Sequence, residues 1–196
     1  VAKQVQSIQQ LSGNRFDFGV GISPWEEDFA VCGVPWERRG KRFDEQLAIL
    51  RGLESGEFFS FEGELHSMPA NKMCPAPTAP TPILMGGHSD PALKRAARVG
   101  DGWMCAGADM SQLTDYITKL KQWREEYGTV DRPFKIFTTG QNAFTPAGIA
   151  ELEALGVTDV VIAFRNVYEL EPDHSLEKKI QMLNWYATEF IGPHRA

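Results

Sequence analysis

Segments typical of strands and segments typical of helices alternate along this chain of 196 residues, and no other feature limits its fold as strongly. Short apolar runs of strand length occur at residues 15–21, 82–85, 102–105, 134–139 and 159–164. Between these runs, apolar residues recur at the spacing of a helix. Strands separated by helices pair in parallel through right-handed crossovers, so the pattern predicts an α/β fold. The pattern fits an open doubly wound sheet, and it also fits an arc of a closed barrel. A closed barrel needs eight strands, and five are visible here.

Local signals predict where several helices begin and end. Residues 12–14 (Ser-Gly-Asn) end a first helix that starts at the first residues of the chain. The segment Ser23–Glu26 has the form of a capping box and predicts the start of a short helix. A longer helix is expected from Val34 onwards, and Asp90 followed by proline predicts the start of another. The last helix carries a predicted buried stripe: Leu176, Ile180, Leu183 and Tyr186.

Residues 55–82 interrupt the alternation. The run 58–65 predicts a small hairpin around Gly63, and a series of prolines then favours an irregular path. A loop of this length is uncommon in a compact domain and is often functional, so we expect residues 55–82 to lie over the active site. We find no repeat, linker or low-complexity segment, and we therefore interpret residues 1–196 as a single domain.

The composition argues against several classes of function. The net charge is −6, and the basic cluster at residues 38–42 is followed at once by Asp44 and Glu45, which is typical of a solvated helix face rather than a nucleic-acid surface. No run approaches the roughly 20 apolar residues of a membrane helix. Three scattered cysteines do not make a disulfide framework and favour a reducing cytoplasm. The four histidines have no spacing typical of a metal site, so we expect no metal, membrane or nucleic-acid partner.

The candidate binding site with the strongest signal is the segment Pro82–Pro91. A buried strand ends there in the pair Gly86-Gly87, and a capped helix follows at once. Glycines allow a ligand to approach the backbone closely, and the start of a helix presents unpaired N–H groups to an anion such as phosphate. Ser89 adds a hydroxyl donor, and His88 could contact a phosphate or a ring. The alternative is a tight turn in which the glycines only permit a positive φ, and the spacing alone leaves both open.

A second candidate is the predicted strand at residues 15–21. Side chains alternate across a strand, so Gly19 and Gly21 share one face while the phenylalanines share the other. Two missing side chains leave room for a flat ring, although glycines also relieve crowding between tilted strands. Trp103 could line such a ring, or it could belong to the core. The acidic residues Glu26–Asp28 lie just beyond this strand, and they also suit the first turn of any helix.

Together these segments resemble the bacterial luciferase-like monooxygenase family, and in particular its branch of oxidoreductases that depend on the deazaflavin coenzyme F420. The resemblance is carried by residues 2–21, 33–51, 61–64 and 82–103, the last running from Pro-Ile-Leu-Met-Gly-Gly to Gly-Asp-Gly-Trp. Order, spacing and content agree from residue 1 to about residue 104, and the remainder fits more loosely.

The resemblance implies a TIM-type (β/α) barrel that binds its cofactor at the carboxyl ends of the strands. Residue 1 corresponds to the family's third helix, so about five β/α units are present and the first three strands are absent. The absent strand ends normally supply acid or base residues, and no catalytic residue is named for this reason. The resemblance places the cofactor phosphate at the glycine pair and the ring at the first strand, with these binding residues: Gly19, Val20, Gly21, Gly86, Gly87, His88 and Ser89.

The implied activity is hydride transfer between a small organic substrate and coenzyme F420. An FMN-dependent monooxygenase of the same fold is the alternative within enzymes. An inactive or partnered module, which binds only a phosphorylated ligand or another chain, is the alternative outside them. The family often dimerises, so a homodimer is also an expectation.

Overall fold

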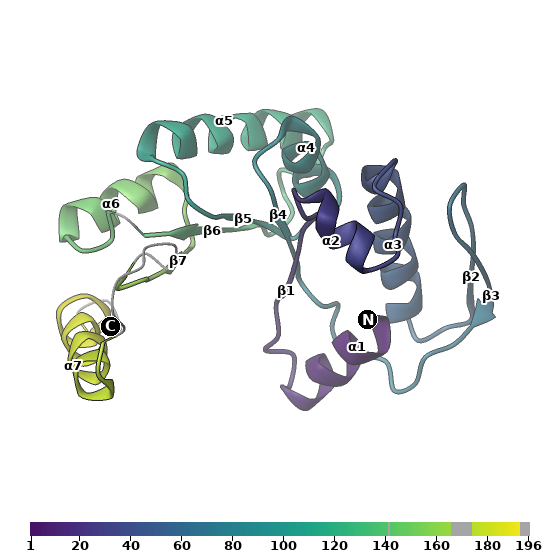
Figure 1. Cartoon of the computed structure of the whole chain (residues 1–196), viewed down its shortest axis with the longest axis horizontal. Helices are drawn as coiled ribbons and strands as arrows, with labels where there is room; N and C mark the ends of the chain where they lie inside the picture. The colour runs from purple at the N-terminus through teal and green to yellow at the C-terminus, as the bar shows by residue number, and fades with distance from the viewer. Residues whose placement is uncertain (141, 166–173, 193–196) are drawn as a thin grey trace.

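The computed structural model describes residues 1–140, 142–165 and 174–192. Its centre is a five-stranded parallel sheet in the order β1-β4-β5-β6-β7 (Figure 1). Each strand is added beyond the previous one, whereas a doubly wound sheet reverses direction at a switch point. The predicted α/β class is confirmed, and the doubly wound alternative is wrong. The strands are β1 (Phe18–Val20), β4 (Ile83–Gly86), β5 (Gly102–Cys105), β6 (Lys135–Thr139) and β7 (Asp159–Val161).

Helices cover one side of this sheet, and Figure 1 shows α4, α5 and α6 along it, with α1 and α7 near the two ends of the arc. Large side chains from these helices and from the strands form one buried cluster that includes Leu93, Trp103 and Leu113. The described helices are α1 (Ala2–Leu11), α2 (Glu26–Val31), α3 (Arg39–Glu54), α4 (Asp90–Val99), α5 (Met110–Glu126), α6 (Pro146–Leu155) and α7 (Leu176–Tyr186), and a π-helix spans Ala187–Ile191.

The two faces of the sheet differ, as the alternation in the sequence predicts. On the helix side, Phe18 and Val20 pack against the core. On the other side, Gly19 is exposed, and Lys135 reaches across the sheet to Asp17, with 2.5 Å between Nζ and Oδ2. The alternation therefore predicts correctly which side chains of β1 face the helices. The strand itself begins at Phe18 and not at residue 15.

Two helix starts differ from the predictions. Ser23 does not cap α2, because its hydroxyl bonds the Asp28 carboxylate (2.5 Å) and Trp25 takes the capping position instead. The long helix α3 begins at Arg39, after a turn in which Arg38 adopts a left-handed conformation with φ of 55°. In α3, Leu47, Leu50 and Leu53 are buried in the interior, and Phe43 is half-buried.

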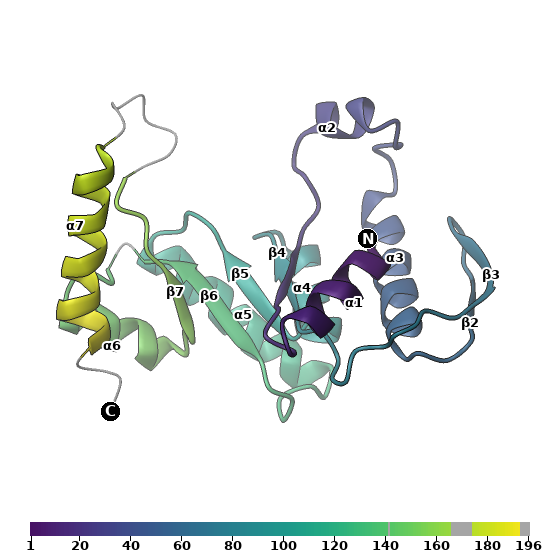
Figure 2. The same ribbon diagram turned by 90° about the horizontal axis from the view of Figure 1, so that it is seen from below.

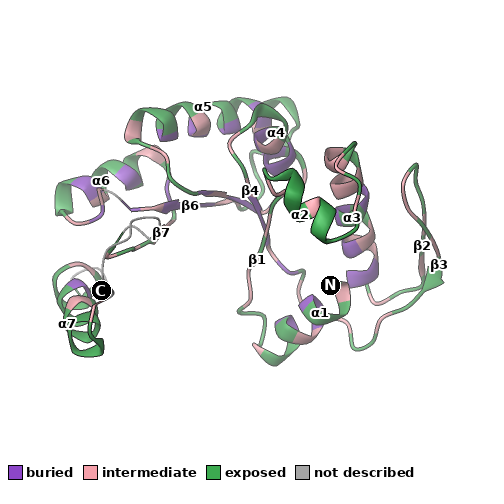
Figure 3. Cartoon of the chain, in the orientation of Figure 1, coloured by how far each residue is buried: buried purple, intermediate pink, exposed green. Residues whose placement is uncertain are grey.

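The predicted apolar stripe of α7 is largely exposed (Figure 3). Only Tyr186 is buried, whereas Leu176 and Leu183 keep 73% and 59% of their surface accessible. No described element covers this side of α7, and the outer edges of β1 and β7 pair with no other described strand. Closing the arc into a barrel requires further strands between β7 and β1.

The hairpin predicted around Gly63 is present but longer than expected. Strand β2 (Phe59–Glu62) pairs antiparallel with β3 (Ser67–Asn71), and Figure 2 shows this hairpin on the side of α3 that faces away from the sheet. The buried carboxylate of Glu45 on α3 accepts the N–H groups of Glu64, Leu65 and His66 at 2.9–3.0 Å. Burial raises the pKa of Glu45, but the hydrogen bonds from His66 and these amides outweigh it and lower the pKa to about 2. The carboxylate is therefore charged at neutral pH and fixes the turn.

The proline-rich part that follows lies at the amino ends of the strands. Asn14, just after α1, donates to the Thr78 hydroxyl (2.6 Å), and residues 77–80 line a hollow of about 430 Å³ together with Asp101 and Arg132. This is the opposite end of the sheet from the glycine pair, so the proline-rich part does not lie over that pair in this structure. The hairpin tip comes closer, through ion pairs of Glu64 with residues at the start of α3. That residues 55–82 lie over the active site stays a prediction.

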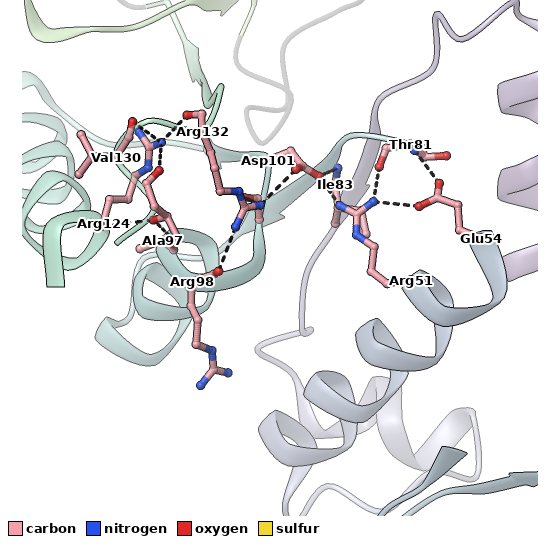
Figure 4. A network of polar contacts seen from close by, with 12 residues as sticks. Arg51, Glu54, Thr81, Ile83, Ala97, Arg98, Asp101, Arg124, Val130 and Arg132 are labelled. Carbon is pink, nitrogen blue, oxygen red and sulfur yellow. Dashed lines mark hydrogen bonds and ion pairs between the residues drawn. The ribbon is translucent and has the colours of Figure 1, made fainter. Parts of the chain in front are cut away.

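A network of polar side chains fixes this amino-terminal end (Figure 4). Asp101 accepts the Ile83 N–H at 2.9 Å and pairs with Arg51, which also donates to the Thr81 carbonyl at 2.7 Å. Arg132 approaches the other oxygen of Asp101 at 3.5 Å. The network joins α3 to the amino ends of β4 and β5.

Candidate functional site

The glycine pair lies where β4 passes into α4. Gly87 has a φ of 117°, which side-chain-bearing residues rarely adopt, and a Cβ there would lie 2.9 Å from Ala92 Cβ. Ser89 is the N-cap of α4, and its carbonyl accepts the N–H groups of Ala92 and Leu93. The N–H groups that precede these in the first turn have no partner inside the helix. The local geometry is therefore the strand–turn–helix corner that the sequence predicts.

The back of this corner is formed by aromatic side chains. Trp103 on β5 is fully buried and donates from its indole Nε1 to the Gly87 carbonyl at 2.9 Å. Of the two interpretations of Trp103, the core residue is confirmed. The His88 ring stacks on Tyr116 of α5, with 5.1 Å between centroids, and its Nε2 lies 3.6 Å from Cys105 Sγ. In this arrangement the ring of His88 is engaged with aromatic side chains of the core.

Cys105 and His88 do not form a nucleophile and base. Burial raises the pKa of the Cys105 thiol to about 11, so the thiol remains protonated at neutral pH. Among the described residues there is also no group of His, Cys, Asp and Glu side chains that could hold a metal ion.

In front of the corner lies a hollow of about 550 Å³ between α3 and α4. Three arginines line it, Arg38 and Arg39 at the start of α3 and Arg95 on α4, and none of the described lining residues is acidic. The amino termini of two helices also meet here, and each adds partial positive charge. Arg38 and Arg95 are ion-paired with Glu64 and Asp44, so the helix starts and Arg39 supply the positive charge that favours an anionic ligand.

The three arginines are held in different ways. Arg95 is 8% exposed and donates from Nε to Asp44 at 2.7 Å and from Nη2 to the Gly40 carbonyl at 3.3 Å. Arg38 pairs with Glu64 of the hairpin. The guanidinium of Arg39 lies 3.5 Å from the centroid of the Trp36 ring, and no carboxylate in the described part of the chain pairs with it. Arg39 is thus positioned by stacking and retains its donors for a ligand.

The carboxyl end of β1 borders this hollow. A Cβ on Gly21 would meet nothing closer than Gly86 Cα at 3.9 Å, and a Cβ on Gly19 nothing closer than the Met104 methyl at 4.0 Å. Gly19, Gly21 and Gly86 therefore leave neighbouring positions of β1 and β4 without a side chain. A second hollow of about 300 Å³ continues from Gly21 between α2 and α3, and Arg39 lines both hollows.

Residues 1–154 match the family described as luciferase-like monooxygenase. The chain belongs to this family. An uncharacterized protein of Mycobacterium tuberculosis is 48% identical over 98% of the chain, and the chain spans 66% of that protein, slightly less than two thirds of its length.

Relatives with a stated cofactor differ in which one they use. An FMNH2-dependent dimethylsulfone monooxygenase of Pseudomonas putida is 30% identical over 83% of this chain and 44% of its own length. An F420-dependent glucose-6-phosphate dehydrogenase of Amycolatopsis mediterranei is 28% identical over 60% of the chain and 36% of its own length. The luciferase-like family thus includes relatives of both kinds, and the cofactor of this chain is a separate question.

Two solved structures show the same fold. The monooxygenase RslO1 from Streptomyces bottropensis superposes with a TM-score of 0.77 at 16% identity, over 100% of this chain and 73% of its own. The coenzyme F420 dependent tetrahydromethanopterin reductase from Methanopyrus kandleri superposes with a TM-score of 0.70 at 15% identity. The match covers 100% of this chain and 78% of the reductase chain. The arc of five β/α units is therefore that of a luciferase-like TIM-type barrel. No described helix is long and apolar enough to cross a membrane.

The residues predicted for this luciferase-like site come together only in part. Gly86, Gly87, His88 and Ser89 all line the large hollow, and Gly21 lines the adjoining one. Gly19 and Val20 line neither, and the Val20 side chain turns into the core. That these residues bind a cofactor stays a prediction.

The arginines were missed. The charge pattern of residues 38–42 predicts a solvated helix face, yet Arg38 and Arg39 line the hollow, as does the nearly buried Arg95. The basic pair at the start of α3 is the signal that could have identified Arg38 and Arg39.

Proposed function

We propose that this luciferase-like protein is an oxidoreductase that transfers a hydride between a small organic substrate and coenzyme F420. The observation that carries the proposal is the hollow at Gly86–Ser89, which has three arginines and no acidic residue among its described lining. It continues directly onto the side-chain-free surface at Gly21. A site for an anion beside a site for a flat ring suits a phosphorylated flavin or deazaflavin.

The residues of this chain hold and orient the cofactor. The backbone N–H groups at Gly87–Ser89 and the guanidinium of Arg39 bind the phosphate. The bare surface at Gly21 and Gly86 lets the ring lie against the strand ends. The cofactor supplies the hydride chemistry, and the protein supplies binding and orientation. Strands that pair with the free edges of β1 and β7 complete the ring pocket and contribute the acid or base groups.

The choice of F420 rests on the segments 33–45 and 86–103, which resemble the deazaflavin branch. An FMN-dependent monooxygenase is the second candidate, and the similarity to the dimethylsulfone monooxygenase favours it. The partnered module remains the third, since the free edges of β1 and β7 are able to pair with another chain. That the protein forms a homodimer also stays an expectation.

A titration decides between the cofactors. The complete polypeptide, with the strands that close the barrel in place, is titrated separately with coenzyme F420 and with FMN while cofactor fluorescence is followed. We expect F420 to bind at least about tenfold more tightly than FMN, which corresponds to about 1.4 kcal/mol. Tight binding of FMN alone rejects the choice of F420, and binding of neither supports the partnered module.

Substitution of Arg39 tests its role as a phosphate ligand. Arg39→Gln removes the guanidinium and its charge and keeps a shorter polar side chain beside Trp36. We expect the affinity for the phosphorylated cofactor to fall about tenfold, because a hydrogen bond between charged groups is lost. The affinity for the same ring without phosphate changes little.

Lys94→Gln is the matched control for Arg39→Gln. It removes one positive charge from α4 at an exposed position that lies over Trp123 and outside the hollow. An equal loss of affinity in both variants means that Arg39 acts only through general charge.

A further inference from the structure

The turn at Gly87 is held from inside the core by Trp103. The indole is fully buried, and Nε1 donates to the Gly87 carbonyl at 2.9 Å. Trp103 does not line the hollow, so it lies behind the turn and cannot contact a ligand there. A buried indole N–H needs an acceptor, and this carbonyl provides one.

The same hydrogen bond fixes the direction of the next N–H. The peptide between Gly87 and His88 is trans. In a trans peptide the carbonyl and the following N–H point in opposite directions across one rigid plane. Because the Gly87 carbonyl points to Trp103, the N–H of His88 points away from the core.

The side chain of residue 88 holds the other end of this peptide. Its ring is stacked on Tyr116 with an interplanar angle of 8°, and it also contacts Trp103 edge-to-face at 6.2 Å. A glycine at position 87 would otherwise leave the peptide free to rotate. Trp103 and Tyr116 therefore restrict this peptide from both sides.

We infer that Trp103 is a positioning residue for the phosphate site: its indole aims the His88 N–H at the cofactor phosphate without touching the cofactor. The inference rests on the proposed function, because it takes the phosphate to lie at this turn. Residue 88 then serves through its backbone donor, and its imidazole serves as an anchor.

The test compares Trp103→Phe with the unchanged protein, again as the complete polypeptide. Phenylalanine keeps an aromatic ring in the core and removes only the N–H donor and part of the ring system. Dissociation constants are measured for FMN and riboflavin, and for coenzyme F420 and its phosphate-free deazaflavin core. We expect the preference for the phosphorylated member of each pair to fall about tenfold in the variant, while the phosphate-free member binds as before.

Trp123→Phe is the matched control, since Trp123 is a nearly buried tryptophan on α5 that does not contact the turn. We expect it to lower stability similarly and to leave the phosphate preference unchanged. A purely structural role of Trp103 would weaken all four ligands equally, and that result overturns the inference. If the unchanged protein itself shows no preference for phosphorylated ligands, the proposed phosphate site fails and the inference fails with it.

A second measurement needs no substitution and applies even if Trp103→Phe does not fold. An anion bound to the His88 N–H polarises the peptide and strengthens the bond from the Trp103 indole to the Gly87 carbonyl. In a protein with ¹⁵N-labelled tryptophan, inorganic phosphate is therefore expected to shift the Trp103 indole proton downfield. Of the other four tryptophans, Trp25, Trp123 and Trp185 serve as internal references, because Trp36 lies against the Arg39 guanidinium. A Trp103 resonance that stays unchanged at saturating phosphate contradicts the inference.

Discussion

Gly21→Val is expected to abolish cofactor binding while leaving the fold intact. A Cβ at this position meets nothing closer than 3.9 Å, and Gly21 does not need a positive φ, so the backbone accepts a side chain here. Its two methyl groups occupy the surface on which the ring lies. We expect the affinity for both the phosphorylated and the phosphate-free ring to fall at least about a hundredfold, with a change in unfolding free energy below about 1 kcal/mol. Fluorescence titration and thermal unfolding measure the two effects.

Two comparisons make the Gly21→Val result specific. Gly21→Ala adds one carbon atom and is expected to give an intermediate loss. Ala30→Val adds a branched side chain at an exposed position on the nearby α2 and is expected to leave binding unchanged. Binding that survives Gly21→Val means that the ring does not lie over β1.

Gly87→Ala is expected to weaken binding of the phosphate selectively. The φ of 117° is unfavourable for alanine, and its Cβ would lie 2.9 Å from Ala92 Cβ, so the turn must move. Such strain costs on the order of 1–3 kcal/mol. We expect a tenfold to hundredfold loss of affinity for the phosphorylated cofactor, at roughly 1.4 kcal/mol per tenfold, and little change for the phosphate-free ring. This selectivity distinguishes the variant from Gly21→Val.

Gly128→Ala controls for backbone strain alone. Gly128 also has a positive φ, of 64°, but a Cβ there meets nothing within 4 Å, and it lies after α5 at the other end of the sheet. We expect a moderate loss of stability and an unchanged affinity for the cofactor. If the phosphorylated and phosphate-free ligands lose affinity equally in Gly87→Ala, the turn is not the phosphate site.

The parts of this fold that depend on local sequence were predictable. The segment from Ile83 to Val99 combines a short apolar run, two glycines and a proline at the first turn, and each signal acts within a few residues. The facing of Phe18 and Gly19 also follows from the alternation within a strand. The strand order, however, required the structure, because pattern alone does not say where successive strands are added.

The missed features depend on contacts between distant segments. Helical spacing shows that Arg95 shares a helix with buried residues, but it does not show that Asp44 on another helix pairs with it. Ser23 fits a capping box, yet its hydroxyl prefers the Asp28 carboxylate. The stripe that includes Leu176 has helical spacing, and its exposure follows from the absence of a covering element among the described residues.

A crystal structure of the complete polypeptide with bound coenzyme F420 tests the account most directly. We expect the phosphorus atom in front of Gly87–Ser89, with a phosphate oxygen about 3 Å from the His88 backbone nitrogen and another near the Arg39 guanidinium. The deazaflavin ring is expected to lie flat over Gly21. A phosphate bound elsewhere, with the space between α3 and α4 filled by solvent or side chains, would contradict the assignment of this corner.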